Sequence, residues 1–137
     1  MTPEQIFSIA NLVAVISWLL LAVFPRRRMV TEVVVGSVVP IALATAYSLI
    51  VVAVWGRSTG SFSTLAGVAT LFGNPWLLLA GWLHYLAFDL LVGRWELHDA
   101  QARGVPHLLV VPCLAVTFLF GPAGWLLYRG LLVVRRW

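Results

Sequence analysis

Residues 6–24 read IFSIANLVAVISWLLLAVF, an apolar run without a charged side chain. A helix of about 20 such residues is long enough to cross the hydrocarbon core of a bilayer. The preceding Thr2-Pro3-Glu4-Gln5 is typical of a helix start, with a capping hydroxyl, a proline in the first turn and an acid near the positive end of the dipole. A secretory signal carries its basic residues first, whereas here they follow at 26–28, so we predict a retained membrane helix.

The composition supports a lipid-facing surface. Hydrophobic residues make up 61% of the 137 residues and charged residues only 10%, with a mean hydropathy of +0.97. A soluble domain carries roughly 25% charged residues, because its surface must be wetted. The net charge of +4 comes from arginines at the ends of apolar runs, where lipid headgroups favour them. This placement argues against a nucleic-acid partner, and the single cysteine, Cys113, is expected to be a small buried hydrophobe.

Three further apolar segments follow the first. Each is close to the length that a membrane-crossing helix requires. The predicted spans are about 6–24, 33–55, 75–95 and 106–128. We therefore predict an all-α integral membrane protein, with residues 1–137 forming one transmembrane domain built as a four-transmembrane-helix bundle.

Proline and glycine residues mark where these helices begin, bend and end. Pro40 is expected to kink the second helix, which neighbouring helices in a bundle tolerate. Asn74-Pro75 caps the third helix, which meets no breaker before Gly104 and is expected to run as far as residue 103. The fourth segment is expected to bend at its own breakers, Pro112 and Gly121-Pro122.

Residues 57–72 between the second and third spans are richer in Gly, Ser and Thr. Apolar residues recur there at intervals of three and four, which indicates a short amphipathic helix: Phe62, Leu65, Val68, Ala69 and Phe72. We expect this helix to lie along the membrane interface or to enter it as a partly re-entrant segment.

Arginines and aromatic residues near the segment ends bear on orientation. With four crossings, one side holds Arg26, Arg27, Arg28, Arg94 and Arg103, and the other holds Arg57, Arg129, Arg135 and Arg136. The excess on the first side favours both termini outside the cytoplasm. Aromatic residues of an interfacial belt are expected at Trp55, Trp76, Trp95, Tyr128 and Trp137.

Nearly all the remaining polar chemistry falls in and after the third span. All three histidines and three of the five acids lie there: His84, Asp89, Glu96, His98, Asp99 and His107. Asp89 lies inside the span, where an ionised carboxylate costs about 2.5–3.5 kcal/mol. It is therefore expected to be protonated, paired or facing a polar cavity. One interpretation is a hydrogen bond that only locks the bundle; the other, which we favour, is a functional acid.

The spacing leaves the partner of Asp89 open. His84 and Asp89 lie about 140° apart around a helix at 100° per residue, so they cannot form a tight pair. One alternative is that His84 and Asp89 flank one cavity. The other is that Asp89 contacts one of the polar groups near the end of the span: Arg94, His98, Asp99 or His107. A second possibility for His84 is a neutral buried ring bonded to a backbone carbonyl.

The polar residues after the span favour a solvated end of the helix. Glu96, Asp99 and Arg103 are expected at the water boundary, with Asp99 and Arg103 as an i, i+4 ion pair. No pair of candidate ligands has a known metal-motif spacing, so no metal site is predicted. No cofactor motif is present either, neither a nucleotide-binding glycine loop nor a CxxC.

A set of motifs in the second half of the chain resembles a known family. The motifs are Asn74-Pro75, GWLHYLAFDL at 81–90, VGRW at 92–95, Asp99-Ala100, Gly104-Val105, His107, Pro112-Cys113, FGPAG at 120–124 and Tyr128. They resemble the abscisic-acid-deficient-four-like membrane family, which includes the plant plastid protein required for neoxanthin synthesis and bacterial members.

The resemblance implies the conversion of violaxanthin to neoxanthin, which rearranges an epoxide into an allenic alcohol without net redox change. Such a step needs an acid for the epoxide oxygen and a base for a carbon-bound proton. Our hypothesis assigns the acid to Asp89 and the base to His84. The residues expected to contact the substrate are Trp82, Tyr85, Arg94, His98, Asp99 and His107.

The start of the chain is neither Ser-rich nor amphipathic, so it does not look like a plastid transit peptide. We therefore expect a bacterial protein of the inner (cell) membrane, whose substrate is a different carotenoid-like or isoprenoid lipid. The leading hypothesis is a membrane-embedded isomerase or related proton-transfer enzyme. The alternatives are a non-catalytic scaffold or pigment-binding accessory subunit of a larger complex, and a small transporter that encloses its path by forming a homo-oligomer.

Overall fold

The computed structural model describes residues 1–135 and is helical throughout its regular structure. Arg136, counted above among the arginines of one membrane side, and Trp137, expected in the aromatic belt, lie outside the described residues. In chain order the helices are α1 (Pro3–Val23), η1 (Met29–Val38), α2 (Val39–Val54), α3 (Leu65–Phe72), α4 (Pro75–Ala102), α5 (His107–Phe120) and α6 (Pro122–Arg135). The predicted all-α class is confirmed.

Three helical segments of the described chain are long and apolar enough to cross a membrane, namely Pro3–Val23, Met29–Val54 and Pro75–Ala102. They correspond to the first three predicted spans. The start of α1 follows the expected chemistry: the Thr2 hydroxyl accepts from the Gln5 backbone N–H, and the Gln5 side chain accepts from the Thr2 N–H.

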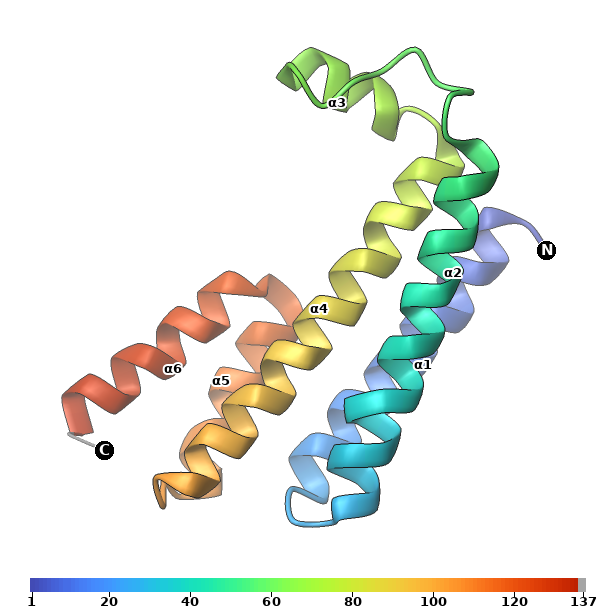
Figure 1. Ribbon diagram of the computed structural model, residues 1–137. Helices are drawn as coiled ribbons and strands as arrows, with labels where there is room; N and C mark the ends of the chain where they lie inside the picture. Colours follow the sequence, from blue (N-terminus) through green and yellow to red (C-terminus); the bar gives the residue numbers. More distant parts are fainter. Residues whose placement is uncertain (136–137) are drawn as a thin grey trace.

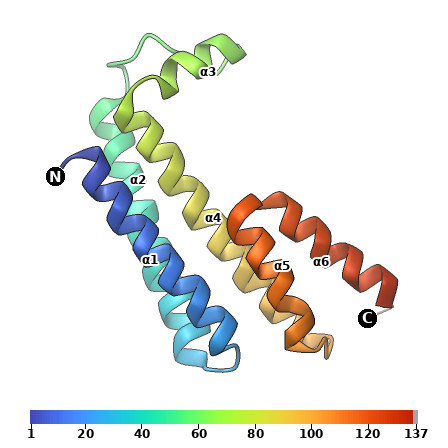
Figure 2. The ribbon, with the colours of Figure 1, turned by 180° about the vertical axis from the view of Figure 1, so that it is seen from behind.

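Helix α4 is the centre of the molecule. Helices α1 and α2 run beside it on one side, and α5 and α6 lie on the other (Figures 1 and 2). Leu83, Leu90 and Leu97, spaced seven residues apart on α4, are at most 1% exposed. On the α1 side, Trp18 packs against Gly93 so closely that a Cβ at position 93 would collide with its ring. Gly93 therefore permits the close approach of α1 to α4.

The second span is one continuous helical rod with two kinds of winding. Its first part, η1, is π-helical, as seen in the Val39 N–H bond to the Val34 carbonyl, and α2 follows with Pro40 in its first turn. A proline inside an α-helix clashes with the carbonyl four residues earlier. The wider π winding ahead of Pro40 gives the proline ring room. The kink expected at this position stays a prediction.

Helix α3 lies across the end of the long helices, away from the α1–η1 loop (Figures 1 and 2). The Thr64 hydroxyl caps it by accepting from the Gly67 N–H at 3.0 Å. The predicted short helix between the second and third spans is therefore present. Its position at the membrane interface stays a prediction.

The fourth apolar segment is two helices and not the single bent helix expected over 106–128. Gly121 has a φ of +45°, and Pro122 opens α6, so the chain reverses after α5. A glycine permits this φ and proline favours a first turn, which together produce a turn where the sequence predicted only a bend. At about 1.5 Å per residue, each 14-residue helix is about 21 Å long, less than the roughly 30 Å of a hydrocarbon core. The number of crossings stays a prediction.

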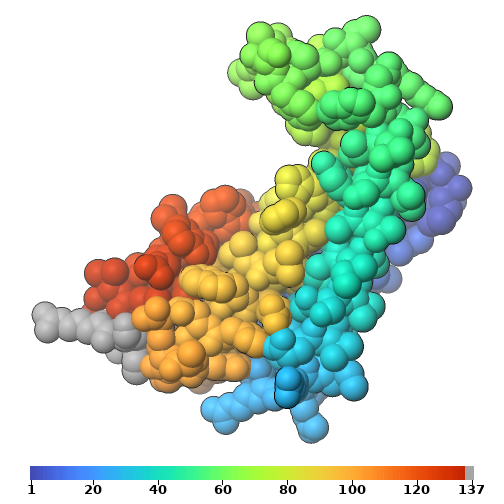
Figure 3. Space-filling model, in the orientation of Figure 1, coloured from blue at the N-terminus to red at the C-terminus, as the bar shows by residue number. Residues whose placement is uncertain are grey.

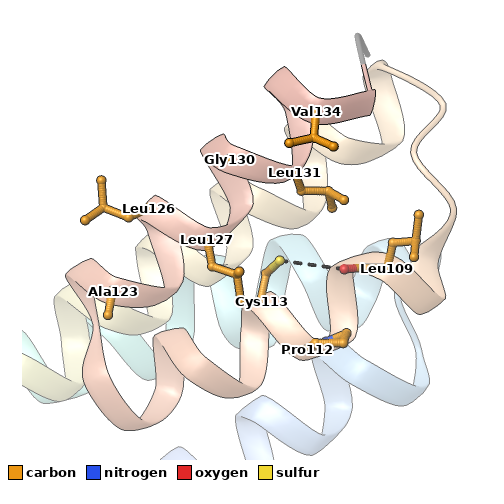
Figure 4. A pocket seen from close by; sticks show the side chains of 9 residues that line it. All are labelled: Leu109, Pro112, Cys113, Ala123, Leu126, Leu127, Gly130, Leu131 and Val134. Carbon is orange, nitrogen blue, oxygen red and sulfur yellow. Dashed lines mark hydrogen bonds between the residues drawn. The ribbon is translucent and has the colours of Figure 1, made fainter.

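An apolar groove of about 670 Å³ runs along the α5–α6 hairpin and is lined by residues of both helices (Figure 4). Cys113 lies in its wall with its thiol 3.6 Å from the Leu109 carbonyl, and the residue is 2% exposed. The expectation that Cys113 is a small buried hydrophobe is confirmed.

Candidate functional site

Asp89 lies at the middle of α4 and faces the turn of the α5–α6 hairpin. A Cβ placed on Gly121 would lie 2.7 Å from Asp89 Oδ1 and 3.0 Å from Oδ2, so the carboxyl group rests against the glycine backbone. Asp89 Oδ2 is buried and has no hydrogen-bond partner among the described residues. Such orphaned polar atoms are rare in native proteins, and active sites are one place where they occur.

An aromatic row leads along α4 to this carboxyl. Trp82, Tyr85 and Asp89 follow at intervals of three and four, which places them on one face of the helix. The Trp82 ring lies 5.2 Å from the Tyr85 ring and 5.4 Å from the Phe7 ring on α1. The structure therefore brings together three of the predicted site residues.

Hydrogen bonds fix the side chains of Trp82 and Tyr85. Trp82 Nε1 donates to Asn11 Oδ1 at 2.7 Å, and the Tyr85 hydroxyl donates to the Phe118 carbonyl at 3.2 Å. Beyond Trp82 an apolar groove of about 270 Å³ opens between the beginnings of α1 and α4, lined in part by Phe7 and Leu78. Trp82 is therefore shared by this groove and the aromatic row that leads to Asp89.

Glu96 is the functional candidate that sequence reasoning misplaced. It was expected at the water boundary, but its residue is 0% exposed and its carboxyl oxygens both lie 3.0 Å from the Thr117 hydroxyl. The α5–α6 hairpin covers it: a Cβ on Gly124 of α6 would collide with Thr117. Asp89 and Glu96 are seven residues apart, two helical turns, so they share one face. That spacing is the signal that could have identified it.

His84 lies on a different face of α4 from Asp89. Its ring packs edge-on against Phe88 at 4.7 Å and lies 5.7 Å from the Tyr47 ring of α2. A small cavity of about 110 Å³ adjoins it, between α2, α4 and the α3 region. The structure does not bring the predicted base together with the predicted acid.

Arg94 and His98 bind the π-helical segment. Arg94 pairs with Glu32 and also donates from Nε to the Thr31 carbonyl at 3.0 Å, while His98 Nε2 lies 2.7 Å from Glu32 Oε1. Gly36 leaves the room for the arginine, because a Cβ there would meet its guanidinium end. These two predicted substrate contacts therefore hold η1 to α4 and lie apart from Asp89.

Asp99 and His107 also take part in bonds within the protein. Asp99 Oδ2 accepts from Arg103 Nε at 2.8 Å, the i, i+4 pair predicted from the sequence, and from the Tyr128 hydroxyl at 2.7 Å. His107 Nε2 lies 2.7 Å from the Ala22 carbonyl at the end of α1. Among the side chains described, no three His, Cys, Asp or Glu residues converge as metal ligands.

These features define an all-helical protein with three helices long and apolar enough to span a membrane, whose central helix carries one half-buried and one fully buried carboxyl residue, Asp89 and Glu96. The chain belongs to the ABA DEFICIENT 4-like family, whose model matches residues 5–128. This match confirms the resemblance drawn from the sequence motifs. Comparison with curated proteins returned no match, and comparison with solved structures returned none either.

Proposed function

We propose that this protein is a membrane-embedded isomerase, or a related proton-transfer enzyme, that acts on a carotenoid-like or isoprenoid lipid through Asp89. The observation that carries the proposal is the uncommitted oxygen of Asp89, buried beside the hairpin turn. Arg94, Glu96, His98 and Asp99 on the same helix all have partners. Asp89 Oδ2 is the buried side-chain oxygen of this helix that has no hydrogen-bond partner among the described residues, and we propose that it exchanges a proton with a ligand.

The chemistry requires no redox partner. In an isomerisation one proton leaves a carbon atom and one proton arrives at an oxygen or at another carbon, while the electrons stay in the substrate. A carboxylic acid can perform both transfers, because it donates from one oxygen and accepts at the other. The apolar surroundings favour the uncharged acid, which is the form that donates.

The neighbouring residues fit a lipid substrate. Trp82 and Tyr85 present ring surfaces along the path to Asp89, and apolar lining with few polar groups is typical of small-molecule sites. Figure 3 shows this central helix open to one side, between α3 and the hairpin. A long apolar molecule in the bilayer would reach the carboxyl laterally, without passing through water.

Two groups are given supporting roles. Glu96, on the same face and hydrogen-bonded by Thr117, is proposed as a second carboxyl that holds a proton in the protein interior. His84 stays a predicted base, but its position on another face favours Asp89 as the group that contacts the reacting atoms.

The test compares lipid extracts from cells that produce the wild-type chain or Asp89→Asn, which keeps the size of the side chain. We expect the product lipid to be lost and its isomer to accumulate with Asp89→Asn, while the purified variant keeps its helical circular dichroism. Thr45→Val, on the exposed side of α2, is the control and should keep the wild-type profile. Identical lipid extracts from wild type and Asp89→Asn would contradict the proposed activity.

The same experiment separates the non-catalytic alternative. If Asp89 only holds the bundle together or supports a larger complex, Asp89→Asn will lower the melting temperature or release partner subunits without changing any lipid. A transporter would instead show a changed proteoliposome flux with unchanged lipids.

A further inference from the structure

A second cleft lies at the opposite end of α4 from the aromatic row. It has a volume of about 400 Å³ between the α1–η1 loop and the α4–α5 loop. Leu97 and Val110 form its buried floor. Its polar lining residues are Arg26, Gln101 and His107, and no acidic residue of the described chain lines it.

Two hydrogen bonds hold the walls of this cleft in place. Gln101 Nε2 donates to the Pro25 carbonyl at 2.6 Å, which ties the first loop to the end of α4. His107 Nε2 bonds the Ala22 carbonyl, and because a carbonyl only accepts, this nitrogen carries the proton. The two loops are therefore fixed relative to each other, and the cleft does not depend on a chance arrangement of surface side chains.

The charge around the cleft is positive. Arg26, Arg27 and Arg28 are exposed and make no ion pair among the described residues, in contrast to Arg94 and Arg103. Helix α5 begins at this cleft without a side-chain cap, so the positive end of its dipole adds to the field. Arginine forms paired hydrogen bonds with phosphate oxygens, which makes an anionic phosphate the ligand that this lining fits.

We propose that this cleft binds a phosphate group, and that the headgroup of an anionic membrane lipid supplies it. The cleft lies where α1 and α4 end and η1 begins, which is where the three long helices would leave the bilayer. The apolar floor, formed by Leu97 and Val110, suits the glycerol and upper acyl part of a lipid, and Arg26 at the rim suits its phosphate. The site is separate from Asp89 and does not depend on the proposed isomerase.

The experiment measures lipid retention by native mass spectrometry of the protein in detergent with phosphatidylglycerol or phosphatidylcholine. Arg26→Gln is expected to reduce the retained phosphatidylglycerol about five- to tenfold, as for the loss of one charge-assisted contact. Arg57→Gln in the distant loop is the matched control that should retain it, and Arg27→Gln, next to Arg26 but outside the cleft lining, should lose less than Arg26→Gln. Equal retention by wild type and Arg26→Gln, or an equal loss in all three variants, would overturn the site.

A second arm distinguishes the source of the phosphate. The thermal unfolding of lipid-free protein is followed with inorganic phosphate and with chloride at matched ionic strength. No stabilisation by phosphate, together with stabilisation by phosphatidylglycerol that Arg26→Gln removes, supports the headgroup assignment. Stabilisation by inorganic phosphate that equals the effect of the lipid would overturn that assignment and leave a site for a soluble phosphate.

Discussion

Two carboxyl groups on one face of α4 have opposite environments. Glu96 is enclosed and receives a hydrogen bond from Thr117, whereas Asp89 has a buried oxygen without a partner. Burial of an unpaired polar group costs free energy, so the arrangement at Asp89 is not explained by stability. This contrast between neighbours on the same helix is the reason that we propose Asp89 as the reacting group.

Gly121→Ala tests the contact between the hairpin turn and Asp89. The new methyl group would lie 2.7 Å from Oδ1, and the positive φ disfavours alanine by about 1–2 kcal/mol. We expect the carboxyl to be displaced and the lipid product to fall as in Asp89→Asn, with a modest drop in melting temperature. Gly130→Ala is the control. Gly130 lies further along α6 with open space around it, so the substitution should leave both measurements unchanged.

Thr117→Val tests the enclosure of Glu96. The substitution keeps the shape of the side chain but removes the hydroxyl that bonds both carboxyl oxygens. An unsatisfied buried acceptor costs about 1–3 kcal/mol, so the free energy of unfolding should fall by that amount. Thr45→Val on the exposed side of α2 is the control. A wild-type stability for Thr117→Val in denaturant unfolding would contradict the hydrogen bond.

At the scale of the elements, the sequence predicts best where the signal is local. The Thr2 cap, the Asn74-Pro75 start of α4 and the Gly104 stop all lie at the predicted positions, because capping depends on residues a few positions apart. Two features depend on other helices and were missed. The π-helical η1 is bonded by Arg94 from α4 at the Thr31 carbonyl, and the burial of Glu96 depends on coverage by the hairpin.

Gly93→Ala tests the close approach of α1 and α4. Its methyl group would collide with the Trp18 ring, and overpacking of this kind typically costs about 1–3 kcal/mol. We expect a lower melting temperature in detergent for Gly93→Ala. The double variant with Trp18→Phe, which removes the colliding ring, should regain part of the loss. An additive further loss in the double variant would show that the two residues are not in contact.

At the scale of the whole molecule, the reversal at Gly121 changes how the last apolar segment relates to the bundle. Gly121 touches Asp89 halfway along α4, and Tyr128 on α6 bonds Asp99 near the end of α4. Helix α5 therefore runs from the α4–α5 loop to the middle of the bundle, and α6 returns toward the same end (Figure 1). The sequence predicted the breakers but not the reversal, because the direction in which a chain leaves a turn is set by what it packs against.

Single-cysteine labelling distinguishes this re-entrant arrangement from four crossings. In a Cys113→Ala background, Arg27→Cys, Ala102→Cys and Arg129→Cys should react with an impermeant maleimide from the same side of the membrane, and Arg57→Cys from the other. A four-crossing bundle would instead place position 129 with position 57. Labelling of 129 and 57 from one side would therefore contradict the re-entrant hairpin.

The indole of Trp82, which is hydrogen-bonded to Asn11 and lies beside the Tyr85 ring, also provides an intrinsic fluorescent probe. A conjugated polyene lying along the aromatic row would quench the emission of this tryptophan by accepting its excitation energy. Trp82→Phe would abolish the part of the quenching that arises there. Intrinsic fluorescence can thus be used to screen unlabelled candidate lipids before any turnover is known.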